Sequence, residues 1–271
     1  MTDVELTHLA GTRGDVVVHR WPHPAPTHRV LLAHGYGEHL GRYHHVAAAL
    51  HANGAEVVGP DHLGHGRSEG ERVLVESYDD VLADFHAAAQ QTPTDLPVVL
   101  VGHSMGGMIA ARYAQLHAAD LTAVVLSGPV LGSWYPVEEF ADGEIPDEPL
   151  DVSTLSRDPA VGERYAADPL IWHGPFKRPT LRAIGRCLDE INNGPRITKP
   201  TLWAHGGDDQ LVPIGPTRAG VARIRGENLT AVEYPGARHE IFNETNADDI
   251  LADVTRFVTS ALRGTPAGLP R

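Results

Sequence analysis

The chain has 271 residues, of which 42% are hydrophobic, so it can form one α/β domain with an insertion or two small domains. Its 35 acidic side chains outnumber 22 basic ones, for a formal net charge of −13. This balance argues against a nucleic-acid partner, because phosphates attract Lys and Arg, and it gives no general attraction to anionic lipid. The single cysteine, Cys187, excludes an intramolecular disulfide.

The sequence contains no sign of export, of a membrane span or of a metal site. Residues 1–6 lack a basic region followed by an apolar core, so no signal peptide is expected. No apolar stretch approaches the roughly 18 residues of a membrane span, and the simplest location is the cytoplasm. His62 and His65 lie in a Gly-rich loop without carboxylates at ligand spacing, and no H-E-x-x-H occurs. We therefore expect no catalytic metal.

The first third of the chain alternates between apolar runs and amphipathic segments. Residues 15–21 predict an edge strand, residues 29–34 a short buried strand and residues 56–60 the next strand. Between the last two, residues 43–52 predict a helix that stops at Asn53-Gly54. Another helix begins at Ser77. Its predicted buried stripe consists of Val81, Leu82, Phe85, Ala88 and Ala89.

The pentapeptide Gly-His-Ser-Met-Gly at residues 102–106 fits the pattern G-x-S-x-G. An apolar strand-like run precedes it at residues 97–101, and a helical segment follows at residues 107–114. A strand, a sharp turn and a helix are the context in which this motif lifts a serine hydroxyl above the sheet edge. The pattern predicts a nucleophile at Ser104. The alternative is a Gly-rich helix cap after a buried strand.

The composition of the chain changes between residues 129 and 195, where Pro, acidic and aromatic residues become frequent and strand-like runs vanish. Strands are predicted before this segment at 121–127 and after it at 200–205 and 229–234. The alternation implies a mostly parallel α/β sheet with helices on both faces. We predict a core of residues 1–128 and 196–271 and a mostly helical cap of residues 129–195 over the strand ends. The alternative is a helical excursion with no role in substrate access.

A serine nucleophile needs a base and an acid that orients the base, and two loops supply them in the order Ser, Asp, His. Asp208 and Asp209 follow the strand that ends at His205, and the spacing Gly-x-x-Asp-x-x-Val-Pro selects Asp209. Asp208 is the fallback, and a simple acidic turn is the alternative. His239 follows the strand that ends at Tyr234, at the sheet edge where α/β sites form.

A tetrahedral oxyanion needs two backbone N–H donors. The residue after the nucleophile, Met105, supplies one. The Gly-rich loop at residues 34–39 follows an early strand, and we assign the second donor to the N–H of Tyr36. The alternative interpretation of residues 34–39 is a Gly-rich turn between a strand and a helix, which also describes this segment.

Four blocks resemble the monoacylglycerol lipases of the α/β-hydrolase superfamily, within the group often labelled serine aminopeptidase or lysophospholipase-like. They are residues 34–39 with Arg42-Tyr43, residues 61–68, residues 102–107, and residues 155–159 with 168–170. The resemblance implies the α/β-hydrolase fold, the triad Ser104, Asp209 and His239, and an oxyanion hole from Tyr36 and Met105. It also implies that Asp61 and His62 brace neighbouring loops without a catalytic role. The family often has Ala or Phe at the position of Tyr36, which leaves the shape of the acyl pocket open.

These features predict a carboxylic ester hydrolase that acts on monoacylglycerols or similar single-chain lipid esters and needs no cofactor. The nearest rival is a lysophospholipase or a general short- or medium-chain carboxylesterase. Dehalogenases and epoxide hydrolases place Asp at the elbow, so Ser104 argues against both. A binding protein on a hydrolase fold is the non-enzymatic rival, although such proteins usually lose a triad member.

An acyl chain needs an apolar channel beside Ser104. Trp134, Tyr135, Ile171 and Trp172 carry large apolar groups within the acidic cap, and we predict that they line the acyl entrance. The alternative is that they pin the cap to the core. The sequence leaves open the oligomeric state and transient contact of the cap with a membrane surface.

Overall fold

The computed structural model describes residues 4–265 and 268–269. The prediction that residues 1–6 form no signal peptide therefore falls partly outside the described residues. Its centre is one eight-stranded sheet in the order β1-β2-β4-β3-β5-β6-β7-β8. The pairs β1–β2 and β2–β4 are antiparallel, and every other neighbouring pair is parallel. The strands are β1 (Glu5–Ala10), β2 (Asp15–Trp21), β3 (His28–Ala33), β4 (Ala55–Pro60), β5 (Val98–His103), β6 (Ala123–Ser127), β7 (Thr201–Gly206) and β8 (Leu229–Tyr234).

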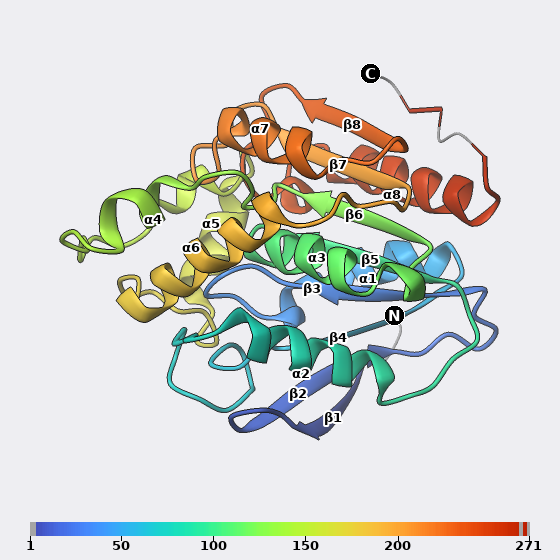
Figure 1. The fold of residues 1–271 in the computed structure, drawn as a ribbon, viewed down its shortest axis with the longest axis horizontal. Coiled ribbons are helices and arrows are strands. Elements are labelled where there is room, and N and C mark those ends of the chain that lie inside the picture. The colour runs from blue at the N-terminus through green and yellow to red at the C-terminus, as the bar shows by residue number, and fades with distance from the viewer. Residues whose placement is uncertain (1–3, 266–267, 270–271) are drawn as a thin grey trace.

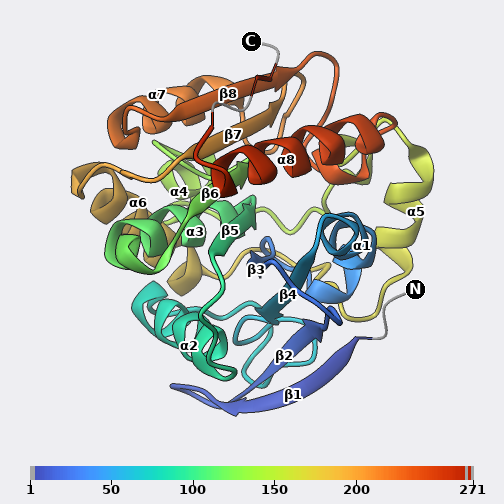
Figure 2. The same cartoon turned by 90° about the vertical axis from the view of Figure 1, so that its right-hand side faces the viewer.

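Helices cover both faces of the sheet, as the sequence predicts (Figure 2). The apolar side chains of one face pack against α2, α3, α6 and α7, and those of the other face pack against α1 and α8. Among the described residues, no helix is both long and apolar enough to cross a bilayer. The helices are α1 (His44–Ala52), α2 (Tyr78–Gln90), α3 (Met105–Leu116), α4 (Tyr135–Phe140), α5 (Pro159–Ala167), α6 (Arg178–Asn193), α7 (Ile214–Ile224) and α8 (Ala247–Leu262), with short 3-10 turns η1 (Leu40–Tyr43), η2 (Ala118–Asp120), η3 (Val152–Thr154) and η4 (Ile241–Asn243).

The edge of the sheet differs from the prediction. Residues 15–21 are not an edge strand, because β1 pairs with β2 along its whole length and takes the outer position. The side chains of β1 are almost all exposed, so the strand has no buried face and no apolar alternation that would identify it in the sequence. Helix α7 was not predicted either. Predicted and observed strands otherwise differ by only one or two residues at their ends.

Residues 129–195 leave the sheet between β6 and β7 and contain α4, α5, α6 and η3, with no strand. We call them the inserted segment. In Figure 1 they lie to the left of the sheet, on the side where the parallel strands end, with α4 farthest out. The C-terminal ends of β5, β7 and β8 therefore face this segment, and these are the strands that precede the predicted site residues.

Candidate active site

Ser104 occupies a sharp turn between β5 and α3. Its φ of 57° and ψ of −120° lie in a region that few non-glycine residues adopt. Two glycines allow this turn by close packing. A Cβ on Gly106 would lie 2.2 Å from the carbonyl oxygen of Ala33, and one on Gly102 would lie 2.2 Å from the carbonyl oxygen of Gly106. The predicted strand, elbow and helix are therefore confirmed, and the small residues are required because backbone passes against backbone.

The structure brings Ser104, His239 and Asp209 together from loops far apart in the sequence. The Oγ of Ser104 lies 2.9 Å from Nε2 of His239, and Nδ1 of His239 lies 2.8 Å from Oδ2 of Asp209. With the imidazole proton on Nδ1, His239 donates to Asp209 and accepts from the serine hydroxyl. This geometry is that of a nucleophile, a base and a group that orients the base.

The carboxylate of Asp209 is fully buried and anchored by its own loop. The backbone N–H groups of Leu211 and Val212 donate to Oδ1, at 3.0 and 2.9 Å. On the other oxygen, Nε2 of His205 lies 3.3 Å away. Burial alone would raise the pKa of Asp209, but the charge of His239 and the hydrogen bonds of His205 and His239 hold it well below its ordinary range. Asp208, the fallback, is exposed and does not contact His239.

His239 is buried, and two opposing effects act on its pKa. Burial lowers it, whereas Asp209, with smaller contributions from Glu240 and Glu38, raises it, and the net pKa lies above its ordinary value. His103, in the motif itself, packs its ring 4.8 Å from that of His239. Burial lowers the pKa of His103 to about 4, so this neighbouring ring is neutral at pH 7.

The amides of Tyr36 and Met105 lie beside Ser104, on the wall of one cavity. Met105 is the first residue of α3, where an N–H has no acceptor within the helix. Neither amide donates a hydrogen bond to another residue in the described part of the chain. Both N–H groups are thus free to bind an oxygen of a substrate, and the positive end of the α3 dipole points toward the same place.

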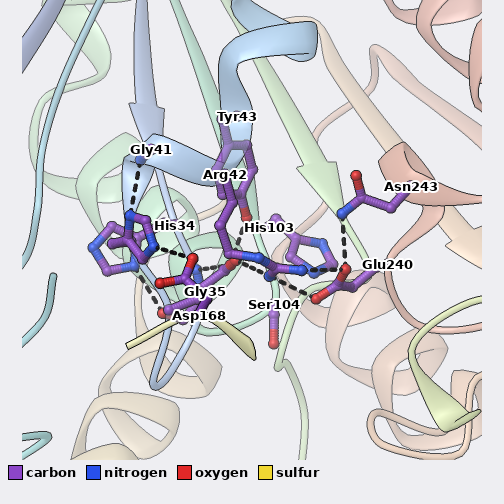
Figure 3. Close-up of polar contacts among 12 residues, drawn as sticks. His34, Gly35, Gly41, Arg42, Tyr43, His103, Ser104, Asp168, Glu240 and Asn243 are labelled. Carbon is purple, nitrogen blue, oxygen red and sulfur yellow. Dashed lines mark hydrogen bonds and ion pairs between the residues drawn. The ribbon is translucent and has the colours of Figure 1, made fainter. Parts of the chain in front are cut away.

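A buried ion network supports this loop, and the sequence reasoning assigned no role to its members. Glu38 accepts from the N–H of Gly35 at 2.7 Å and from the hydroxyl of Tyr43 at 2.6 Å. Arg42 bridges Glu38 to Glu240, to which it donates two hydrogen bonds at 2.7 and 2.8 Å (Figure 3). The network joins the loop of Tyr36 to the residue after His239. The i, i+4 spacing of Glu38 and Arg42 is the signal that could have shown it.

Asp61 and His62 brace loops, as the resemblance implies. Asp61 accepts from the N–H groups of Leu40 and Arg67 at 2.8 and 2.9 Å, and its Oδ2 lies 3.1 Å from His19. The N–H of His62 donates to Nε2 of His34 at 3.0 Å. Neither side chain reaches Ser104, Asp209 or His239.

Hydrogen bonds connect the inserted segment to each loop of the site. Trp172 donates its N–H to the carbonyl of Gly37 at 2.8 Å, beside Tyr36. The indole of Trp134 donates to the carbonyl of Leu211 at 2.9 Å, beside Asp209. The N–H of Glu240 donates to the carbonyl of Leu155 at 2.8 Å, beside His239. The segment is therefore positioned by the same loops that carry the site.

A cavity of about 530 Å³ lies between the inserted segment and the strand ends, with Ser104 and His239 on its wall. Three of the four predicted entrance residues, Trp134, Tyr135 and Trp172, line it. Ile171 does not, which corrects the prediction. Ile171 is buried within the inserted segment against Leu155, Val161 and Tyr165, because a small apolar core of its own holds this part of the segment together. The lining is otherwise largely apolar and aromatic; it includes Val130, Phe140, Leu150, Leu155, Tyr165 and Phe176.

Comparisons with known proteins identify the family of the chain. Residues 24–246 match a hydrolase family model described as serine aminopeptidase, S33. The chain is 39% identical to a monoacylglycerol lipase of Mycolicibacterium smegmatis, over 94% of this chain and 96% of the relative. It is 30% identical to a monoglyceride lipase of Mus musculus, over 98% of this chain and 94% of the relative.

A solved structure extends the likeness to the fold. The crystal structure of a monoacylglycerol lipase from Paleococcus ferrophilus superposes with a TM-score of 0.79 at 25% identity. The match covers 95% of this chain and 99% of that one. The predicted α/β-hydrolase fold is confirmed.

Proposed function

Since the chain belongs to the serine aminopeptidase, S33 family of α/β-hydrolases, we propose that it hydrolyses monoacylglycerols to fatty acid and glycerol through Ser104, His239 and Asp209. The observation that carries the proposal is the hydrogen-bonded chain from Ser104 to His239 to Asp209 on the wall of an apolar cavity. The relatives that bear the name monoacylglycerol or monoglyceride lipase support the choice of ester.

In the first half of the reaction the serine oxygen attacks the ester carbonyl. A bond forms between Oγ and the carbonyl carbon while the Oγ proton moves to Nε2 of His239. The tetrahedral oxyanion accepts hydrogen bonds from the N–H groups of Tyr36 and Met105, and losing one such donor typically costs about 3 kcal/mol in the transition state. Collapse of the intermediate breaks the bond to the alcohol, which takes the proton from His239 and leaves as glycerol.

In the second half, water releases the fatty acid from Ser104. His239 removes a proton from the attacking water, and the second tetrahedral intermediate collapses with the proton returned to Oγ. Asp209 stabilises the imidazolium that forms in both halves, which is consistent with the raised pKa of His239 and the lowered pKa of Asp209. No step needs a cofactor or a metal.

The proposal assigns residues 129–195 the role of a cap that shapes access to Ser104. Trp134 and Trp172 line the cavity and are each hydrogen-bonded to a loop of the site. A cavity of about 530 Å³ with a largely apolar lining has room for an acyl chain, which supports a lipid ester as the substrate. The exposed side chains of Tyr135 (42%) and Leu150 (40%) at the cavity mouth support transient contact with a lipid surface.

A substrate panel tests the proposal. Purified protein is assayed on mono-, di- and triacylglycerols, lysophospholipids and p-nitrophenyl esters with matched acyl chains. We expect the highest kcat/KM on a monoacylglycerol. A clear preference for lysophospholipids or for short p-nitrophenyl esters would replace this substrate by the corresponding rival. No turnover of any ester would favour a binding protein.

A second experiment tests the nucleophile. A fluorophosphonate probe should label wild-type protein at Ser104, as read by peptide mass spectrometry, and should not label Ser104→Ala. Ser104→Ala and His239→Ala should each lower kcat by about 10⁶-fold, because such residues act as a unit. Circular dichroism of each variant, compared with that of the wild type, checks that it remains folded. Near-normal turnover by a folded Ser104→Ala variant would refute the mechanism.

A further inference from the structure

The walls of the cavity beside Ser104 carry more acidic side chains than permanently charged basic ones. Four carboxylate side chains line it, and no Lys or Arg does so among the described residues. Glu38 and Glu240 are buried at its inner end, and Glu148 and Asp151 are exposed at its mouth. A cavity that bound a phosphate or a carboxylate in its head-group region would be expected to present Arg or Lys to it, and the free N–H at the start of α3 lies beside Ser104, where it faces the ester carbonyl instead.

Among the described residues, the cation that contacts Glu38 and Glu240 at the inner end is Arg42, and its charge is already paired. The terminal nitrogens of Arg42 donate to Glu38 and to Glu240, and Figure 3 shows the contact with Glu240. The guanidinium lies 5.0 Å from the ring centre of Tyr165. Only 12% of its side chain is exposed. With two carboxylates around one guanidinium, the inner end keeps a net negative charge. An anionic group on a substrate would therefore find no partner there to replace its lost hydration.

The mouth of the cavity is negative for a different reason. Residues 141–151 contain five carboxylates and no Lys, Arg or His. Within the described structure, Glu148 and Asp151 form no ion pair, whereas Asp142 of the same stretch pairs with Arg182 at 2.7 Å. Asp151 accepts from the N–H of Ser153 at 2.9 Å, and this bonding to Ser153 lowers the pKa of Asp151, so the carboxylate is charged at pH 7.

The cations nearest the mouth are engaged elsewhere. Arg178 donates to the carbonyls of Phe140 and Ala141, at 3.0 and 3.1 Å. Arg238 donates to the carbonyl of Ser156 at 3.0 Å and to that of Ser153. Lys177 is paired with Glu71. None of the three side chains lines the cavity.

We propose that Glu148 and Asp151 make this cavity selective for esters with an uncharged alcohol portion and reject anionic head groups such as a phosphate monoester. This inference rests on the proposed ester hydrolysis. It specifies which esters are substrates by the charge of their alcohol portion. Charges at the mouth act on a substrate over about 8 Å at physiological ionic strength, and low-dielectric walls focus their field along the channel. The apolar lining accepts the acyl chain of either ester equally, so the head group decides.

The experiment compares two esters with the same acyl chain, one of which carries an added phosphate on its glycerol. One is 1-octanoylglycerol and the other is 1-octanoylglycerol 3-phosphate, both kept below their critical micelle concentrations. The ratio of kcat/KM for neutral to anionic ester is measured at low ionic strength for wild type, Glu148→Gln, Asp151→Asn and the double variant. Both replacements keep the size of the side chain. Asp151→Asn also keeps a side-chain oxygen that can accept from the N–H of Ser153 and cap η3. Glu163→Gln is the matched control, because Glu163 is exposed on α5 and does not line the cavity.

We expect the wild type to favour the neutral ester, and each mouth substitution to reduce the ratio by a factor of about two to five. Activity on the neutral ester should stay within about twofold, and Glu163→Gln should leave the ratio unchanged. Added salt should reduce the ratio for the wild type more than for the double variant. An equal wild-type rate on both esters, an unchanged ratio in the double variant, or an equal shift in Glu163→Gln would overturn the proposal.

A second ester pair separates this inference from the choice of glycerol as the alcohol. It consists of p-nitrophenyl octanoate and the same aryl ester with a ring carboxylate. The different leaving groups cancel when variants are compared with the wild type. If monoacylglycerol is not a substrate but the aryl pair shows the same loss of charge discrimination, the proposed function fails and the inference stands. If monoacylglycerol is hydrolysed and neither pair responds to the substitutions, the inference fails alone.

Discussion

Two regions face each other across the cavity and are built in opposite ways. The strand ends that carry Ser104, Asp209 and His239 are close-packed, with backbone against backbone at Gly106 and with the carboxylates of Asp209 and Glu240 buried and paired. The inserted segment, residues 129–195, is anchored by α6, which packs into the main apolar core, by hydrogen bonds to those loops and by a small apolar core around Ile171, whereas its remaining stretch reaches out toward solvent. Residues 141–151 of this segment are largely exposed.

The difference separates chemistry from selection. A reacting constellation must be held within fractions of an ångström, so it belongs where packing allows one arrangement only. A wall that selects substrates by size and charge depends on the side chains that face the substrate more than on a rigid geometry. Exposed carboxylates and aromatic rings are side chains of this kind. Changes at the strand ends should therefore act on kcat or on folding, whereas changes in the inserted segment should act on discrimination between esters.

Among the changes that compare the two regions, the largest effect is expected at the orienting carboxylate. Asp209→Asn should lower kcat by about 10⁴-fold, by analogy with serine proteases, because the amide holds the imidazole in the wrong tautomer. Asp208→Asn is the matched control and should change kcat little, since Asp208 is exposed. Side-by-side kinetics on one p-nitrophenyl ester measure both. A larger loss for Asp208→Asn would reassign the acid.

Acid should weaken the strand-end region through its buried neutral histidines. Burial lowers the pKa of His62 to about 3 and that of His65 and His103 to about 4, against 6.5 in an unfolded chain. Between about pH 6.5 and pH 4 the unfolded state therefore binds more protons, and stability falls as pH falls, by up to about 1.4 kcal/mol per pH unit for each histidine.

Urea unfolding between pH 7 and pH 4.5 measures this slope. His62→Gln should reduce the slope of the free energy of unfolding against pH, by an amount that corresponds to the uptake of up to one proton on unfolding. His173→Gln, at the exposed histidine of the inserted segment, should leave it unchanged. A free energy of unfolding that does not change over this range would show that the three rings already bind protons in the folded protein.

A pair of glycines tests the packing contrast directly. Gly106→Ala should lower the free energy of unfolding by at least about 2 kcal/mol, because its Cβ would lie 2.2 Å from a backbone oxygen that cannot move alone. Gly185→Ala on α6 would meet only a methyl of Val137, at 3.0 Å. The gain in helix propensity, about 1 kcal/mol, should offset that contact. Denaturant titration of both variants gives the comparison, and equal losses would contradict it.

The smallest effect is expected at the cavity wall of the inserted segment. Trp172→Ala should reduce kcat/KM more for long-chain than for acetate esters, because each buried CH₂ contributes about 0.8 kcal/mol and a shortened wall buries fewer of them. Ile171→Ala is the neighbouring control. It should lower activity on short and long esters alike, since Ile171 packs inside the segment. A chain-length series from acetate to dodecanoate separates the two patterns.

Local signals in the sequence were sufficient for the elbow and for the order of the site residues. The pattern G-x-S-x-G between a β-type run and a helical run is a property of neighbouring residues, and so is the placement of Asp209 and His239 directly after strands. Parallel strands end at one edge of a sheet, so residues after strand ends could be expected to meet there. The observed distances of 2.8 and 2.9 Å agree with that expectation.

Features without a local signal were decided by the tertiary structure. The exposed strand β1 has no apolar alternation and exists because β2 offers it a hydrogen-bonding edge. Ile171 and Trp172 are adjacent in sequence and equally apolar, yet only Trp172 lines the cavity, because the fold of the inserted segment turns them in different directions. Arg42 and Glu240 are 198 positions apart in the sequence and form a buried ion pair. The burial of this pair decides whether the charge of Arg42 is available to a ligand. Strand pairing, side-chain direction and ion pairing of this kind depend on which residues become neighbours in the folded protein. These neighbours are determined only when the whole chain has packed.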